Sequence, residues 1–128
     1  MKLNQKQKEY IDHKLDELSH SKFRSSFHLR KYMIQMIDEK GFDIIEKHAY
    51  DFIHKNLQTI LPNDGKQTPM KGHPVFLAQH ACGCCCRGCL EKWHHIPKTR
   101  DLEEREVTYL VALIIEWIQR EYNLAKGK

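Results

Sequence analysis

The sequence predicts an all-α protein, a single small helical domain of about five helices with one long loop and a Cys/His-rich segment. Apolar residues recur at intervals of three and four over most of the chain, which is typical of amphipathic helices. No stretch indicates a strand by alternating apolar and polar residues. The length of 128 residues is that of one domain, so we expect residues 1–128 to fold as a unit.

The first half of the chain predicts three helices. Residues 4–19 are a charged helix that we expect to be peripheral, with Leu15 and Leu18 on its apolar side. The next helix begins at a cap on Ser25 or Ser26 and ends at Gly41. A third helix follows at once and is stopped by Pro62.

A loop and three further helical segments make up the second half. Three of the four prolines fall in residues 62–74, and thirteen residues is a long connection, of a kind that is often functional. Pro74 suits the first turn of a helix over VFLAQHA. A short helical segment is expected within 85–94, and Asp101 is expected to cap a last helix that runs to about Tyr122.

Charge and hydropathy bear on location and partners. No window approaches the roughly 18 apolar residues of a membrane span, and the polar first residues do not resemble a secretory signal, so we expect a cytoplasmic protein.

The net charge of +4 is concentrated in residues 65–100, with six Lys/Arg and one acidic residue. This segment predicts a contact face for nucleic acid or an anionic ligand. Alternatively, its charge only balances a cluster of thiolates.

All five cysteines lie within "HACGCCCRGCLEKWHH", which runs from His80 to His95. In a reducing compartment such cysteines are more often metal ligands than disulfides. Cys86 and Cys89 have the C-x2-C spacing of zinc sites, and Cys85 shares a helical face with Cys89. We expect Gly83 and Gly88 to provide the sharp turn that convergence requires. The segment predicts one transition-metal ion, zinc before iron, because the cysteine spacing fits no iron–sulfur pattern. Two histidines, five residues outside these cysteines, complete the candidate ligands: His80, Cys85, Cys86, Cys89 and His94.

Other interpretations of the cysteines stay open. Two of the five suit a role as small buried hydrophobes. Cys86 and Cys89 also suit a thiol oxidoreductase, in which Arg87 or a helix N-terminus lowers a thiol pKa. Covalent haem attachment is excluded, because Leu90 stands where C-x-x-C-H requires histidine.

Weaker candidates are interpreted structurally. His48 and His54 lie on different faces of their helix, which indicates surface or core-edge positions. Trp93 and Trp117 are more typical of core anchors than of a platform for stacking bases.

The chain resembles a family of small, mostly bacterial proteins known only as a domain of unknown function. The resemblance spans roughly Leu15 to Tyr122, and its most specific parts are "GKQTPMKGHPVFLAQH" and "CCRGCLEKWH". Cys82 and Cys84 depart from the family pattern, so the resemblance implies ligands drawn from His80, Cys85, Cys86, Cys89 and His94. It implies no activity. The matching residues are Gln67, Thr68, Pro69, Gly72, His73, Pro74, Gln79, His80, Cys85, Cys86, Arg87, Cys89, Trp93 and His94.

The leading hypothesis is a small metal-stabilised binding domain, in which the metal is mainly structural and the basic 65–100 segment is the contact face. The alternative is an enzyme. One form is a metal-dependent hydrolase with an open coordination site beside Gln67, His73 and Arg87. The other is a Cys86/Cys89 thiol oxidoreductase.

Overall fold

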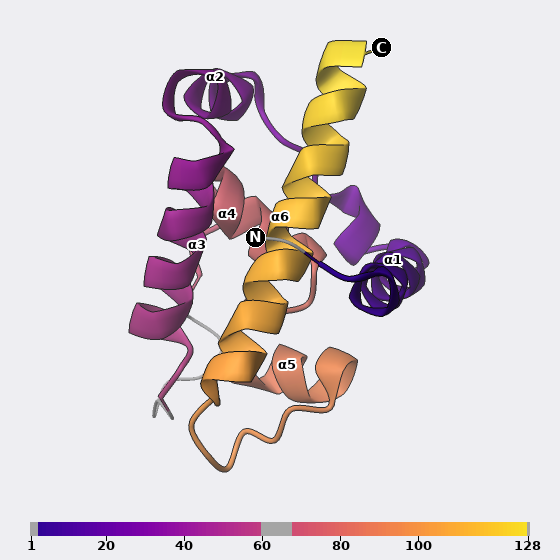
Figure 1. Ribbon diagram of the computed structural model, residues 1–128, viewed down its shortest axis with the longest axis vertical. Coiled ribbons are helices and arrows are strands. Elements are labelled where there is room, and N and C mark those ends of the chain that lie inside the picture. The colour runs from indigo at the N-terminus through magenta and orange to yellow at the C-terminus, as the bar shows by residue number, and fades with distance from the viewer. Residues whose placement is uncertain (1–2, 60–67, 128) are drawn as a thin grey trace.

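Six α-helices and one 3-10 turn make up the part of the chain described by the computed structural model, residues 3–59 and 68–127 (Figure 1). Those residues include no strand, which confirms the predicted all-α single domain. The elements are α1 (Gln5–Ser19), η1 (Arg24–Ser26), α2 (Lys31–Lys40), α3 (Phe42–Asn56), α4 (Pro74–Ala81), α5 (Arg87–His94) and α6 (Glu104–Gly127).

α6 is the longest helix, and the others are arranged around it. It packs against α3, α4 and α1, and Figure 1 shows α3 along one side of it and α1, seen nearly end-on, along the other. Each large apolar side chain buried here contributes about 1.5–3 kcal/mol. The apolar face of α6 is therefore the main source of the core. Its buried residues are Val107, Leu110, Val111, Ala112, Leu113, Ile114 and Ile118.

The second helix begins later than predicted. Ser25 and Ser26 lie in η1, where their backbone N–H groups donate to Ser21 and Phe23, and α2 starts only at Lys31. A serine favours a tight turn as readily as a helix cap, because its hydroxyl bonds to nearby backbone groups in both. The prediction of a cap at these serines was wrong. The consequence is a turn that directs Arg24 into the interior, where it is 8% exposed.

The predicted ends of two other helices were also inaccurate. α3 ends at Asn56 and not close to Pro62, and the backbone oxygen of Gln58 accepts a hydrogen bond from Leu102. Residues 60–67, which include much of the predicted 62–74 loop, lie outside the described residues. α6 begins at Glu104, three residues after Asp101, and the Glu106 carboxylate accepts a hydrogen bond from the backbone N–H of Glu103 just before the helix.

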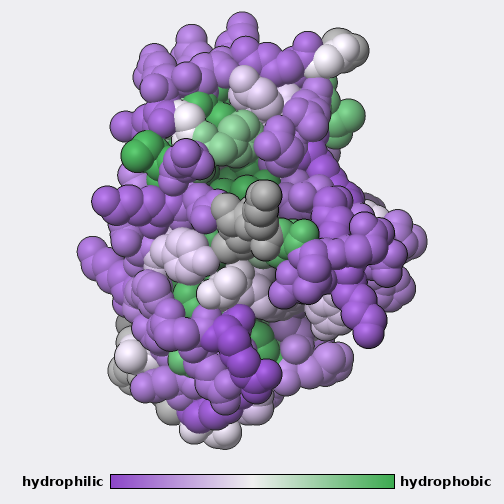
Figure 2. All heavy atoms as spheres, in the orientation of Figure 1, coloured by the Kyte–Doolittle hydropathy of each residue, from purple (hydrophilic) through white to green (hydrophobic). Residues whose placement is uncertain are grey.

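Hydrophilic residues cover most of the face drawn in Figure 2, and hydrophobic residues show between them in patches. Over the described residues, each helix is too short or too polar to cross a lipid bilayer. The fold therefore places its apolar side chains mainly in the interior. The two tryptophans, as predicted, pack against the buried core, together with the partly buried Tyr109.

Candidate metal centre

Three thiols meet at the start of α5. The sulfur atoms of Cys85, Cys86 and Cys89 all lie within 4.8 Å of one another. The distance between Cys85 Sγ and Cys89 Sγ is 3.7 Å, and that between Cys86 Sγ and Cys89 Sγ is 3.0 Å. A tetrahedral zinc ion with Zn–S bonds of about 2.3 Å separates its sulfur ligands by about 3.8 Å. One sulfur pair already has this spacing and the other needs less than 1 Å more, so the group fits a metal ion.

The start of α5 is what holds two of these thiols together. Cys86 is the N-cap residue, with extended backbone, and its sulfur accepts a hydrogen bond from the backbone N–H of Cys89 at 3.4 Å. The C-x2-C spacing therefore places both sulfurs at the helix N-terminus, where the partial positive charge favours thiolates. Cys85 precedes the helix, and its carbonyl accepts a hydrogen bond from Thr68 Oγ1 at 2.8 Å.

The turn between α4 and α5 depends on Gly83, as predicted. Its φ of 68° lies in the left-handed region, and a Cβ there would come within 2.8 Å of Trp93 Cδ1. Any side chain at this position would therefore add both backbone strain and a steric overlap. Gly88, which was also expected in this turn, lies instead within the first turn of α5.

Cys82 and Cys84 point into the core instead of the thiol group. Both side chains are fully buried among the core hydrophobic residues, and Cys82 Sγ lies 3.9 Å from the carbonyl oxygen of Leu113. Burial raises the pKa of both thiols well above the ordinary value. Neutral, buried thiols pack as small hydrophobes. Cys82 and Cys84 are therefore the two cysteines that suit the role of small buried hydrophobes.

Arg24 lies against the thiol group, and sequence reasoning missed it. Its Nη2 donates to Cys89 Sγ at 3.1 Å, and its Nη1 donates to the carbonyl oxygen of His80 at 2.7 Å and to Cys85 Sγ at 3.5 Å. A Zn²⁺ ion with three thiolates carries a net charge of −1, which one guanidinium balances. An arginine so far from the cysteines in the sequence gives no signal of this contact.

The hydrogen bonds among the thiols separate their acidities. The hydrogen bond from Cys89, together with the bond and charge of Arg24, lowers the pKa of Cys85 to about 7 against the effect of burial. The same bond, followed by burial, raises the pKa of Cys89. In the metal-free protein at neutral pH, Cys85 therefore gives up its proton more readily than Cys89 does.

The two histidines proposed as ligands lie outside the thiol group. His80 Nε2 lies 3.1 Å from the carbonyl oxygen of Pro69, and its ring stacks on Phe27 with a centroid distance of 5.3 Å. His94 Nε2 lies 2.8 Å from the carbonyl oxygen of Cys82, and its Nδ1 lies 2.9 Å from Tyr109 Oη. Both ring nitrogens of His94 are therefore occupied, and burial lowers its pKa to about 4. Ligation by His80 or His94 stays a prediction without support from this geometry.

The three residues suggested for a hydrolase pocket are engaged elsewhere or lie outside the described residues. Arg87 is 2% exposed, and its guanidinium donates to four backbone carbonyls at 2.6–3.5 Å. His73 caps α4 by accepting from the N–H of Val75, and its Nε2 lies 2.9 Å from His48 Nδ1. Gln67 lies outside the described residues. The role of Arg87 beside the thiols, expected from the sequence, is taken by Arg24. The backbone carbonyls that accept from Arg87 are those of Leu57, Gln58, Pro97 and Arg100.

The basic 65–100 segment offers less free charge than its composition indicates. Arg87 is buried on carbonyl oxygens, and Arg100 forms an ion pair with Glu106 at 2.8 Å. Lys66 lies outside the described residues. The exposed lysines of this segment in the described chain are Lys71, Lys92 and Lys98.

Comparison with known proteins adds a family but no activity. A search of solved structures finds no match. A family model matches residues 12–119, a range that extends from α1 into α6 and contains every cysteine. This confirms the resemblance to a domain of unknown function. The chain therefore belongs to the family described as "Domain of unknown function (DUF4186)".

Proposed function

We propose that this protein binds one Zn²⁺ ion through the thiolates of Cys85, Cys86 and Cys89, and that the ion is mainly structural. The observation that carries the proposal is the convergence of three sulfur atoms within 4.8 Å. Soft thiolates favour zinc, copper(I) or iron–sulfur clusters among biological metals. A cluster normally takes four cysteines, whereas Cys82 and Cys84 are directed into the core.

A structural role follows from what the three cysteines would join. α5 has only 8 residues, and a helix of this length is marginal without tertiary support. An ion held by Cys85 and by the first turn of α5 would fasten this helix to the preceding turn. Arg24 extends the link to η1. Three protein ligands also leave a fourth position for water or for a donor from a partner.

The first experiment is elemental analysis of anaerobically purified protein. We expect about one zinc per chain in the wild type and loss of zinc in Cys86→Ser and Cys89→Ser. Cys82→Ala and Cys84→Ala are the matched controls, since they remove thiols from the same segment but leave the three-sulfur group intact. Metal-free wild-type protein with five reactive thiols would refute the proposal.

A second measurement tests the structural role. Removal of zinc by a chelator under reducing conditions should lower the free energy of unfolding, because a ligand that binds only the folded state stabilises it. The metal-free Cys86→Ser variant should be insensitive to the same chelator. Equal unfolding free energies with and without zinc would reject a structural role and leave an exchangeable metal site.

A thiol oxidoreductase is the second candidate, and one distance favours it. Cys86 Sγ and Cys89 Sγ are 3.0 Å apart at a helix N-terminus, close enough to form a disulfide with little movement. Cys86 and Cys89 would transfer two electrons and two protons to a disulfide substrate. The two cysteines would then form a disulfide, and the substrate would be released as two thiols. Metal-free purified protein with a reversible Cys86–Cys89 disulfide would favour this candidate over the zinc site.

Nucleic acid or an anionic ligand stays the predicted partner of the 65–100 segment. Exposed lysines at 71, 92 and 98 are the positions to test, by changing all three to Gln. Binding to phosphate groups should weaken steeply with added salt, and the salt dependence should be shallower in the triple variant. Binding with equal salt dependence in both proteins would refute this contact face.

A further inference from the structure

A cleft between α1 and α6 lies apart from the three thiols. Its volume is about 550 Å³, and its lining comes from the first turns of α1 with the preceding Leu3, and from the first half of α6. This volume is in the range of sites that enclose small organic molecules, roughly 300–1,000 Å³. Neither the proposed zinc site nor the oxidoreductase alternative uses it.

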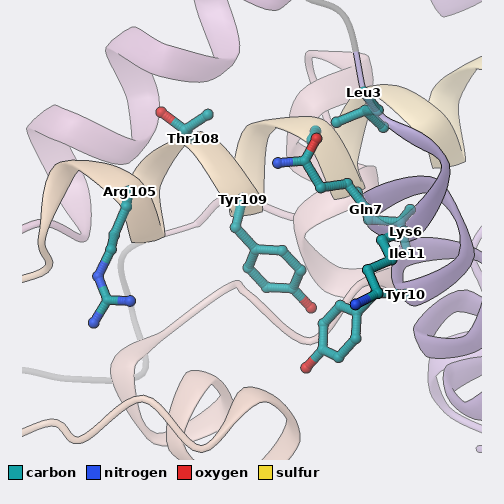
Figure 3. Close-up of a pocket in the computed structure, with 9 residues that line it drawn as sticks. Leu3, Lys6, Gln7, Tyr10, Ile11, Arg105, Thr108 and Tyr109 are labelled. Carbon is teal, nitrogen blue, oxygen red and sulfur yellow. The ribbon is translucent and has the colours of Figure 1, made fainter.

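The interior of the cleft is apolar and aromatic. Leu3, Ile11 and Ala112 contribute aliphatic surface, and the rings of Tyr10 and Tyr109 lie against each other with a centroid distance of 5.7 Å (Figure 3). Tyr10 is 53% exposed, a high fraction for so large a side chain. A ligand with a hydrocarbon body would cover this surface and gain from its removal from water.

The charged residues in the described part of the lining are cationic. Lys6 contributes an ammonium group from α1 and Arg105 a guanidinium from α6, on opposite sides of the Tyr109 ring in Figure 3. Among the described residues, the lining contains no acidic side chain. Glu103 accepts from Arg105 Nε at 2.5 Å, which balances part of this charge at the rim. The potential inside the cleft is therefore positive and favours an anion.

The hydroxyl group of Tyr109 has a defined direction. A carbonyl oxygen can only accept, so His94 Nε2 carries the proton in its contact with Cys82, and Nδ1 of the neutral ring accepts from Tyr109 Oη. The Tyr109 oxygen thus offers only lone pairs to the cleft, and Tyr10 also forms a hydrogen bond with it. A carboxylate has no proton to donate to this oxygen, so the carboxylate of a ligand would bind beside Lys6 or Arg105.

We propose that the cleft binds a small amphiphilic carboxylate, with its hydrocarbon body against the exposed surfaces of Tyr10 and Tyr109 and its carboxylate at Lys6 or Arg105. The apolar surface favours the hydrocarbon body, and the cationic Lys6 and Arg105 in the described lining favour the negative charge. Arg105 is the preferred partner for the carboxylate, because a guanidinium binds it in a bidentate manner.

The test compares decanoate with decanol, which has the same chain and no charge. Binding of each to the full-length protein is measured by competition with a fluorescent aromatic sulfonate. Decanoate should bind the wild type roughly three- to tenfold more tightly than decanol, the size expected for one or two exposed charge contacts. Equal affinities for the two probes would overturn the charge selection.

Variants then locate the binding. Thr108→Trp, at an exposed position in the cleft lining, should abolish binding of both probes by filling the space. A Lys6→Gln/Arg105→Gln variant should bind decanoate no better than decanol, whereas the exposed Lys98→Gln control should behave as the wild type. Wild-type binding by the Thr108→Trp protein would place the ligand elsewhere and overturn the proposal.

Discussion

Arg24 shows how one side chain sets the chemistry of the cysteine group. The three cysteines could be predicted from the sequence because their spacing is local and the geometry of a helix start is known. Arg24 lies 61 residues from Cys85 and 65 from Cys89, and only the packing of η1 on α4 brings it there. Such a contact depends on the tertiary fold, and no local pattern encodes it.

Replacement of Arg24 should reduce the reactivity of Cys85. In metal-free protein, Arg24→Gln removes one of the groups that lower the Cys85 pKa to about 7, so this pKa should rise. A smaller thiolate fraction at pH 7 should slow alkylation by iodoacetamide by about three- to tenfold. Peptide mass spectrometry would identify the alkylated cysteine, and the pH dependence of its rate would give the pKa.

Arg120→Gln is the control for this experiment, since Arg120 binds Asp12 and Glu116 on the surface. The control should alkylate at the wild-type rate. An unchanged rate in Arg24→Gln at pH 7 would show that the hydrogen bond from Cys89 accounts for the acidity alone.

At the scale of elements, the sequence predicted helices better than their boundaries. Apolar periodicity identified α1, α3 and α6 because each buries a continuous stripe on the same core. The starts of α2 and α6 were misplaced because serine and aspartate favour turns and caps alike. α5 has only 8 residues, and its position depends on Arg87, whose four carbonyl partners lie after α3 and in the α5–α6 connection.

Arg87→Met should destabilise the fold strongly. Methionine keeps most of the side-chain volume but removes every donor from four backbone carbonyls, which are buried or partly buried. Loss of hydrogen bonds from a buried charged group should lower the free energy of unfolding by about 3 kcal/mol or more. Urea unfolding of the zinc-loaded and metal-free proteins would measure this.

The matched control for Arg87→Met is Arg105→Met. Arg105 is 80% exposed and pairs only with Glu103 among the ion pairs of the described residues, so its loss should leave the free energy of unfolding nearly unchanged. Similar losses in the two variants would mean that Arg87 does not hold α5 in place.

At the scale of the whole molecule, two buried histidines connect distant segments. His94 joins α5 to the turn at Cys82 and to Tyr109 of α6, and His73 joins the start of α4 to His48 of α3. The sequence marked both as possible metal-site residues, because a histidine near cysteines favours that interpretation. Their actual partners are a backbone oxygen, a backbone N–H, a tyrosine and another histidine, which only the three-dimensional packing determines.

These histidines should make the metal-free protein lose stability in mild acid. Burial lowers the pKa of both His73 and His94 to about 4, below the ordinary value of about 6.5. Between these values the unfolded chain binds protons that the folded chain does not, so the free energy of unfolding falls as pH falls from 6.5 towards 4. For His94, which is 8% exposed, the full loss would be up to about 3 kcal/mol.

Urea unfolding of metal-free protein at pH values from 6 to 5 would isolate this effect, because Cys85, with a pKa of about 7, is largely protonated there. The strongest carboxylate contribution, that of Glu106 with a pKa of about 2 beside Arg100, is lost only at more acidic pH. His94→Gln should flatten the pH dependence, because the unfolded chain then has one fewer proton to gain. The exposed His13→Gln control should keep the wild-type slope. Parallel profiles for His94→Gln and the wild type would show that His94 protonation does not limit the acid stability of the fold.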